Sequence, residues 1–120
     1  MLQQPQKQKE QAAVVIPPVN IHETDREVTL EAEMAGVLKD DISIELKNDE
    51  LVISAHRREP EIPKEYRVVH RERYPVEYHR AFVLGAEASK ETISADYKNG
   101  ILTVRIPKSE ETKPRKIAIS

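Results

Sequence analysis

Apolar and polar residues alternate along much of the chain with the two-residue period of half-buried β-strands. In one run, Val28, Leu30 and Ala32 are separated by threonine and glutamate. The same alternation predicts strands at 28–34, 42–46, 51–55, 93–97 and 102–106. Further strands are predicted at 19–25 and 78–84, and only 86–91 is predicted to make a helical turn. Many short strands with almost no helix predict an all-β fold.

Two hairpin turns connect neighbouring strands. Asn99-Gly100 lies between the strands predicted at 93–97 and 102–106, and Asn and Gly tolerate the positive φ that both turn positions need. Asn48-Asp49-Glu50 predicts a three-residue turn between 42–46 and 51–55. The hairpins predict two antiparallel sheets packed face to face, an immunoglobulin-like β-sandwich.

The chain divides into an arm, a domain and an extension. Pro17-Pro18 blocks continuation of a helix or a central strand, so the glutamine-rich residues 1–18 are predicted to be a flexible N-terminal arm. Residues 19–108 contain all the predicted strands and have the length of one ordinary domain. Residues 109–120 are predicted to be a C-terminal extension, polar and charged except near its end.

A long charged segment interrupts the alternation at 57–76. It is crowded with arginine, glutamate and lysine and is punctuated by Pro60, Pro63 and Pro75. A connection of this length is uncommon inside a compact domain unless it has a function or an element of its own. Residues 66–70 are predicted to form a short strand, and the sheet of a partner subunit is one place where that strand can pair.

Composition limits the partners. The chain has 19 basic and 21 acidic residues, a net charge of -2, so no overall positive field attracts nucleic acid or anionic membrane. Without cysteine there is no disulfide or thiolate chemistry. No apolar run reaches the length of a membrane span, and residues 1–11 lack the apolar core of a secretory signal. We therefore expect a cytoplasmic protein.

No motif for catalysis, metal or cofactor binding is present. No nucleophile elbow, phosphate loop or dinucleotide motif occurs, and metal-ligand spacing is lacking among His22, His56, His70 and His79. Four acidic residues of the predicted strands are expected on the solvent side: Glu31, Glu33, Glu45 and Asp96. The sequence predicts no enzyme and no cofactor. A minor hypothesis is that protonating the histidines in or beside 57–76 weakens a subunit interface.

One segment carries a family resemblance. Residues 95–108, which read Ala-Asp-Tyr-Lys-Asn-Gly-Ile-Leu-Thr-Val-Arg-Ile-Pro-Lys, resemble the signature of the α-crystallin domain of small heat-shock proteins, the HSP20 family. Three further segments agree with the family pattern: 35–42, 51–54 and 80–84. Ile117-Ala118-Ile119 resembles the isoleucine-x-isoleucine motif found beyond this domain in many members.

The resemblance implies a function without chemistry. Such proteins are ATP-independent chaperones, or holdases, that bind partly unfolded proteins and prevent their aggregation under stress. It also implies a homo-oligomer built from dimers, in which the inner strand of 57–76 pairs with the neighbouring subunit's sheet. The implied dimer interface comprises Tyr66, Arg67, Val68, Val69, His70, Arg71 and Arg80.

The terminal motif is suited to binding a sheet edge. In an extended chain, Ile117 and Ile119 face one way and Ala118 faces the other, so the segment can add to an edge strand and place two side chains in pockets. The resemblance implies a receiving groove lined by Ile42, Ile44, Leu46, Ile93, Ala95 and Tyr97. We hypothesise that a tail that dissociates from the groove exposes it to unfolding client proteins. The alternatives are a frayed terminus or a last strand in the chain's own sheet.

Other interpretations stay open. The run Val14-Val15-Ile16 is a second candidate contact for clients, or it merely leads into the first strand. The arm has no aromatic residue, so the size of the assembly is not predicted. The main alternative function is a CS-domain co-chaperone adaptor that docks on an ATP-driven chaperone, although such adaptors usually lack both the long loop and the terminal motif. A carbohydrate-binding sandwich is weaker, because the chain has no tryptophan and few aromatics.

Overall fold

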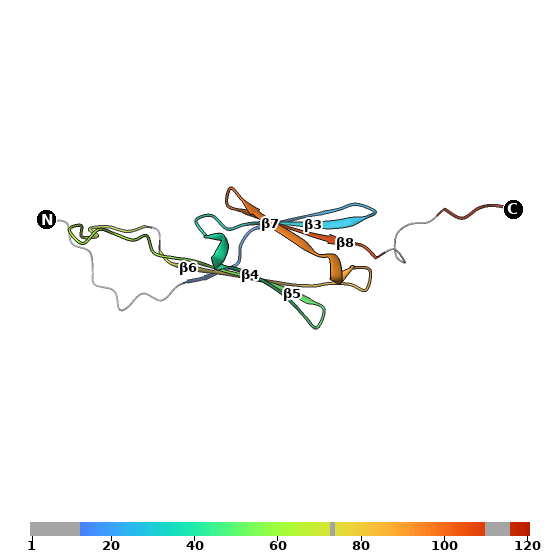
Figure 1. The fold of residues 1–120 in the computed structure, drawn as a ribbon, viewed down its shortest axis with the longest axis horizontal. Helices are drawn as coiled ribbons and strands as arrows, with labels where there is room; N and C mark the ends of the chain where they lie inside the picture. The colour runs from blue at the N-terminus through green and yellow to red at the C-terminus, as the bar shows by residue number, and fades with distance from the viewer. Residues whose placement is uncertain (1–12, 73, 110–115) are drawn as a thin grey trace.

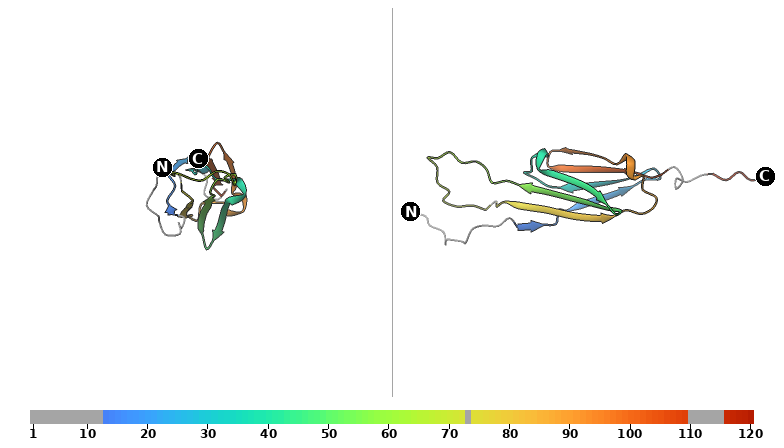
Figure 2. Two further views of the ribbon diagram at one scale, coloured as in Figure 1. Left: turned by 90° about the vertical axis from the view of Figure 1, so that its left-hand side faces the viewer. Right: turned by 60° about the horizontal axis from the view of Figure 1, so that its bottom comes forward.

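Two four-stranded sheets pack face to face in the computed structural model, which describes residues 13–72, 74–109 and 116–120 (Figures 1 and 2). One sheet has the order β1-β6-β5-β4 and the other β2-β3-β8-β7. The strands are β1 (Ala13–Val15), β2 (Val19–Glu23), β3 (Glu27–Glu33), β4 (Ile42–Lys47), β5 (Glu50–Arg57), β6 (Val76–Val83), β7 (Ser94–Lys98) and β8 (Ile101–Pro107). All pairings except β1 with β6 are antiparallel. The predicted all-β sandwich is confirmed.

The core consists of the alternate residues that the sequence pattern marked as apolar. Met34, Ile53 and Val104 are 0% exposed. Val104 lies opposite Leu30 in the β3–β8 pair, so the buried side chains of neighbouring strands share one face. Each fully buried side chain of this size contributes about 1.5–3 kcal/mol relative to an exposed one. The alternation therefore determines which face of each strand points inward.

Both hairpin turns use left-handed residues. Asn99 and Gly100 have φ of 54° and 77°, as predicted for the β7–β8 turn. The predicted three-residue turn between β4 and β5 is wrong, because Lys47 pairs with Glu50 and only Asn48 and Asp49 lie between them. These two residues have φ of 51° and 66°. Asn and Asp adopt this conformation more readily than other side chains, so two residues complete the turn.

Strand β1 was not predicted as a paired strand. It runs parallel to the start of β6, with Ala13 opposite Val76 and Val15 opposite Tyr78. Pro17, among the most completely buried side chains, follows it, and the chain then enters the other sheet as β2. The proline pair thus marks the crossing between sheets. Residues 1–12 of the predicted arm lie outside the described part of the chain.

Helical structure in the described residues is limited to two single turns. The helical turn predicted at 86–91 appears slightly later as the 3₁₀ helix η2 (Lys90–Thr92). A second one, η1 (Lys39–Asp41), precedes β4 and was not predicted, since three residues carry no helical periodicity. Over the part of the chain that the structure describes, no helix is long and apolar enough to cross a membrane.

The charged connection between β5 and β6, residues 58–75, is called the excursion here. It projects beyond the end of the sandwich (Figure 2). None of its described residues belongs to a strand, so the strand predicted at 66–70 is not formed in the single chain. A strand is defined by pairing, and the described residues of this segment pair with no sheet of their own chain.

Candidate assembly and client-binding sites

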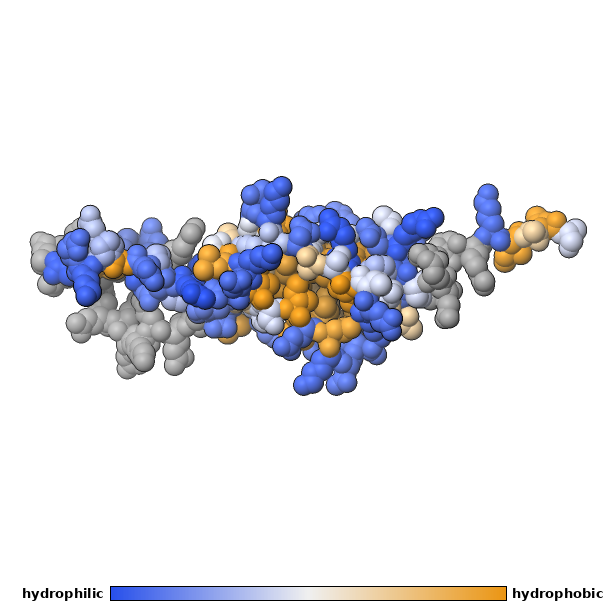
Figure 3. Space-filling view, in the orientation of Figure 1, coloured by the Kyte–Doolittle hydropathy of each residue, from blue (hydrophilic) through white to orange (hydrophobic). Residues whose placement is uncertain are grey.

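The edge strands β4 and β7 turn apolar residues toward the inside of the sandwich, and the surface that these residues line is called the groove. In β7, Ala95 pairs with buried Val104 and Tyr97 with buried Leu102, so both side chains belong to the inner face. In β4, Ile44 lies opposite buried Ile53. Strand β7 lies above β4 in the view of Figure 1, and apolar surface gathers on this face of the molecule in Figure 3.

The groove is open to solvent along part of its length. Leu46 is 39% exposed and Ala95 is also exposed, while the other four predicted lining residues pack partly against the core: Ile42, Ile44, Ile93 and Tyr97. Five of the six predicted residues therefore lie on the inner sides of the edge strands β4 and β7, and Ile93 lies between η2 and β7. An apolar edge of this kind can receive an extended segment by β-augmentation.

Polar contacts fix both ends of the groove. The hydroxyl of Tyr97 donates a hydrogen bond of 2.8 Å to the carbonyl oxygen of Met34, which holds the ring in place as a wall. At the opposite end, Lys90 of η2 forms an ion pair with Asp49 in the β4–β5 turn. Neither contact could be predicted from the sequence, because each joins residues far apart in the chain.

The tail motif does not contact the groove within one chain. Ile117 is 90% exposed and Ile119 is 98% exposed. Residues 116–120 form no strand, so the alternative of a last strand in the chain's own sheet is not observed. The groove and the motif are both left available.

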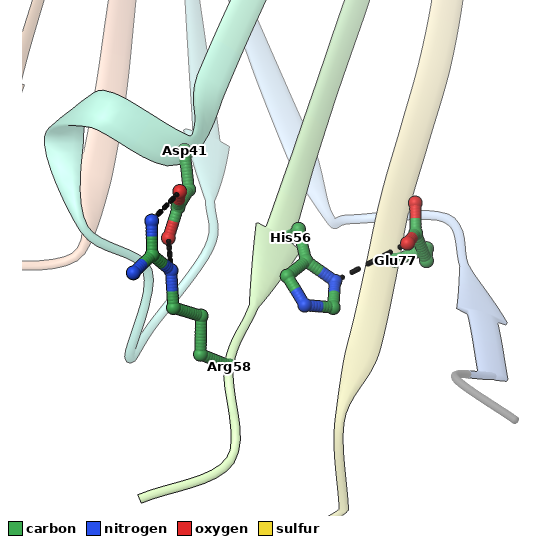
Figure 4. Close-up of polar contacts among 4 residues, drawn as sticks. All are labelled: Asp41, His56, Arg58 and Glu77. Atoms are coloured by element: carbon green, nitrogen blue, oxygen red, sulfur yellow. Dashed lines mark hydrogen bonds and ion pairs between the residues drawn. The ribbon is translucent and has the colours of Figure 1, made fainter. Parts of the chain in front are cut away.

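Ion pairs hold the base of the excursion (Figure 4). Arg58 donates to Asp41 from Nε at 2.6 Å and from Nη2 at 2.7 Å, a bidentate pair that joins the excursion to η1. The hydrogen bonds from Arg58 hold the pKa of the Asp41 carboxyl below its ordinary value. This pair was not predicted, since an arginine in a charged run carries no sign of its partner.

Histidine contacts at the excursion are with carboxylates. His56 Nδ1 lies 3.2 Å from Glu77 Oε1 across the β5–β6 pair (Figure 4). His70 Nε2 lies 3.7 Å from Glu72 Oε1. The hypothesis that protonating these histidines weakens a subunit interface stays a prediction.

Arg80 contacts the arm in the single chain. Its Nη1 donates a 3.3 Å hydrogen bond to the carbonyl oxygen of Pro17, and its guanidinium carbon lies 5.0 Å from the centroid of the Phe82 ring. Arg80 thereby holds the corner where the chain passes between sheets. In the arm beside it, Val14 is 74% exposed and Ile16 is 71% exposed.

Comparison with known proteins decides the family. The sequence pattern of the Hsp20/alpha crystallin family matches residues 20–120. The chain belongs to this family of small heat-shock proteins. It is 37% identical over 105 residues to small heat shock protein C2 of Rickettsia felis, covering 88% of this chain and 68% of that one. It is 34% identical to a probable 15 kDa heat shock protein of Leptospira interrogans, covering 83% and 75% respectively.

Solved structures of small heat-shock proteins share the fold. Heat shock protein 16.0 from Schizosaccharomyces pombe matches with a TM-score of 0.71 and 28% identity, covering 88% of this chain and 99% of that one. A small heat-shock protein from Xylella fastidiosa, described as having a distinct high order structure, matches with a TM-score of 0.70 and 28% identity, covering 88% and 97%. The chain spans about two-thirds of the length of small heat shock protein C4 of Rickettsia felis, to which it is 32% identical.

Acidic and histidine side chains are scattered over the described surface of this small heat-shock protein. Its described residues contain no cluster of three or more histidine, cysteine, aspartate or glutamate side chains able to hold a metal ion. Its exposed large apolar side chains include Leu46 of the groove, both isoleucines of the tail motif and residues of the arm and the excursion, and also Ile21, Leu38, Val83 and Ile101.

Proposed function

We propose that this small heat-shock protein is an ATP-independent holdase that binds partly unfolded proteins through apolar sheet-edge surfaces. The observation that carries the proposal is that the β4–β7 groove is uncovered while Ile117 and Ile119 are almost fully exposed in the same chain. A groove that accepts an extended aliphatic segment also accepts similar segments of an unfolding protein. The adaptor alternative gains no support from the structure or from the relatives.

The energetics favour contacts that are individually weak. Burying two isoleucines contributes roughly 3–6 kcal/mol, and ordering the tail offsets much of it. Several tails bound in one assembly act together, because each later contact forms at high effective concentration. We propose that tails of one subunit occupy grooves of another and release them under stress.

The excursion supplies a second contact in this proposal. Tyr66 is 69% exposed, and Val68 and Val69 are each 45% exposed. Such side chains on an extended segment suit pairing with the sheet edge of a second copy. The exchanged segment, together with Arg67, His70, Arg71 and Arg80, is proposed as the dimer interface, and Val14, Val15 and Ile16 as a weaker client contact.

The remaining proposals concern chemistry and location. We propose that the protein acts without enzymatic turnover and without a cofactor. A sandwich without cysteine needs no oxidising compartment, and we place the protein in the cytoplasm on that basis.

The test is the aggregation of a heat-labile client, followed by light scattering during warming without nucleotide. We expect suppression at about equal subunit ratios, since each chain offers one groove. Bovine serum albumin at the same mass serves as the control for crowding. Unchanged scattering, with the protein still folded by circular dichroism, would contradict holdase activity.

A further inference from the structure

The two legs of the excursion face each other without a β-ladder. The leaving leg starts at Arg58 and the returning leg ends at Pro75, and no described residue between them is assigned to a strand. The tip turns at 63–66, where the Tyr66 N–H donates a 2.9 Å hydrogen bond to the carbonyl oxygen of Pro63. Such a turn brings the legs back alongside each other (Figures 1 and 2).

Side chains connect the legs at two levels. Arg57, the last residue of β5, donates from Nη2 to the carbonyl oxygen of Tyr74 at 2.8 Å. Further out, the guanidinium of Arg71 forms an ion pair with Glu59. Position 57 is connected with 74 and position 59 with 71. Moving outward along one leg therefore moves outward along the other, toward the turn at 63–66, as for facing positions in a hairpin. The side chains therefore set a register between the legs.

The same contacts attach the ribbon to the sandwich. Arg57 Nη1 also donates to the hydroxyl of Tyr78 in β6 at 3.4 Å. Arg58 holds Asp41 of η1 through its bidentate pair. Both legs are thus anchored at the base, and the Glu59–Arg71 pair is the outer link between them.

The ribbon presents apolar side chains on an open backbone. Ile62 is 43% exposed, Tyr66 69%, and Val68 and Val69 45% each. The backbones of Val68 and Val69 form no hydrogen bond with any residue that the structure describes. An extended pair of valines with unpaired backbone groups is the form in which a chain adds to a sheet edge.

We propose that the Glu59–Arg71 pair is a positioning contact that holds the excursion in the shape in which a second copy of this chain accepts it. The inference rests on the dimer of the proposed function. A ribbon ordered before binding loses less conformational entropy when it docks, which increases affinity without any new contact to the partner. In this account Arg71 belongs to the dimer interface through the shape that it gives the excursion, because its own ion pair is with Glu59 of the same chain.

Charge reversal separates this role from direct contact with the partner. Glu59→Arg and Arg71→Glu each place like charges across the legs, and the two changes together restore an opposite-charge pair in reversed order. Native mass spectrometry of the full chain on dilution gives the concentration at which half the chains are monomeric. We expect each single reversal to raise that concentration about tenfold, and the double reversal to return it to within about threefold of the parent.

The outcomes distinguish the possible failures. Melting by circular dichroism is expected to be the same in all four proteins, because both residues lie outside the sheets. Single reversals that dimerise like the parent would overturn the inference. A double reversal as weak as the singles would also overturn it, since Arg71 would then act on the partner directly. A parent that is monomeric at every concentration would overturn the proposed dimer itself and the inference with it.

Discussion

Single residues in this protein act mainly by fixing backbone segments. The hydroxyl of Tyr97 holds the carbonyl of Met34, Arg80 holds that of Pro17, and Arg57 holds that of Tyr74. In each case a long side chain from a strand donates a hydrogen bond to a loop or corner whose backbone lies outside the hydrogen-bonded strands of the sheets. Asp41 and Arg58 do the same with charges, at the point where the excursion leaves the sandwich.

The Asp41–Arg58 pair predicts a pH dependence of stability. Because Arg58 lowers the pKa of Asp41 in the folded state, the pair stabilises the fold above the ordinary carboxyl pKa of about 3.9. That stability is lost as the pH falls through the lower folded-state pKa. Asp41→Asn is therefore expected to lower the urea midpoint of unfolding at pH 7 and to match the parent near pH 2.

The neighbouring carboxylate provides the matched control. Asp40 is exposed and forms no ion pair in the described structure, so Asp40→Asn is expected to leave the midpoint almost unchanged at either pH. If the urea midpoint of Asp41→Asn stayed below that of the parent at low pH, the side chain would stabilise the fold through something other than its charge.

At the scale of elements, the two faces of each strand have separate roles. In β7, Ala95 points into the groove, whereas Ser94 lies opposite exposed Arg105. The alternation visible in the sequence was enough to predict this division, and also the β7–β8 turn. The β4–β5 turn was predicted one residue too long. Asn48, Asp49 and Glu50 are all polar, so the sequence does not reveal that Glu50 already pairs with the opposite strand.

Elements that depend on distant contacts could not be predicted. The apolar run 13–15 gives no sign that it lies parallel to β6, because parallel partners are joined by no local turn. The ribbon form of the excursion rests on pairs such as Glu59 with Arg71, and many such pairings are possible in a segment with this many charges. The groove residues were predicted from the family resemblance, not from their spacing.

The faces of β7 lead to a paired prediction. Ala95→Glu places a charge in the apolar groove, where binding the tail would require costly desolvation. We expect the assembly to fall to dimers in size-exclusion chromatography with light scattering. Ser94→Glu changes the same strand on its outer face and is expected to keep the parent mass. Equal masses for the two variants would argue against the groove as the receiving site.

In the proposed assembly, the whole molecule carries both halves of two different contacts. The proposed exchange of excursions is reciprocal, so it would close on itself as a two-fold dimer. The proposed docking of a tail into a groove is one-directional, so it would link dimers into larger closed assemblies or chains. In this proposal the excursion determines the building block, the tail determines how many blocks assemble, and a groove vacated by a tail is where a client would bind.

The mass of the assembly formed by an Ile117→Ala, Ile119→Ala variant tests this account most directly. Ala118→Ser, which alters the residue that faces away from the two isoleucines, is the matched control. The account predicts that the double variant dissociates to dimers in native mass spectrometry while the control keeps the parent mass. A double variant with the parent mass would contradict docking of the tail into the groove.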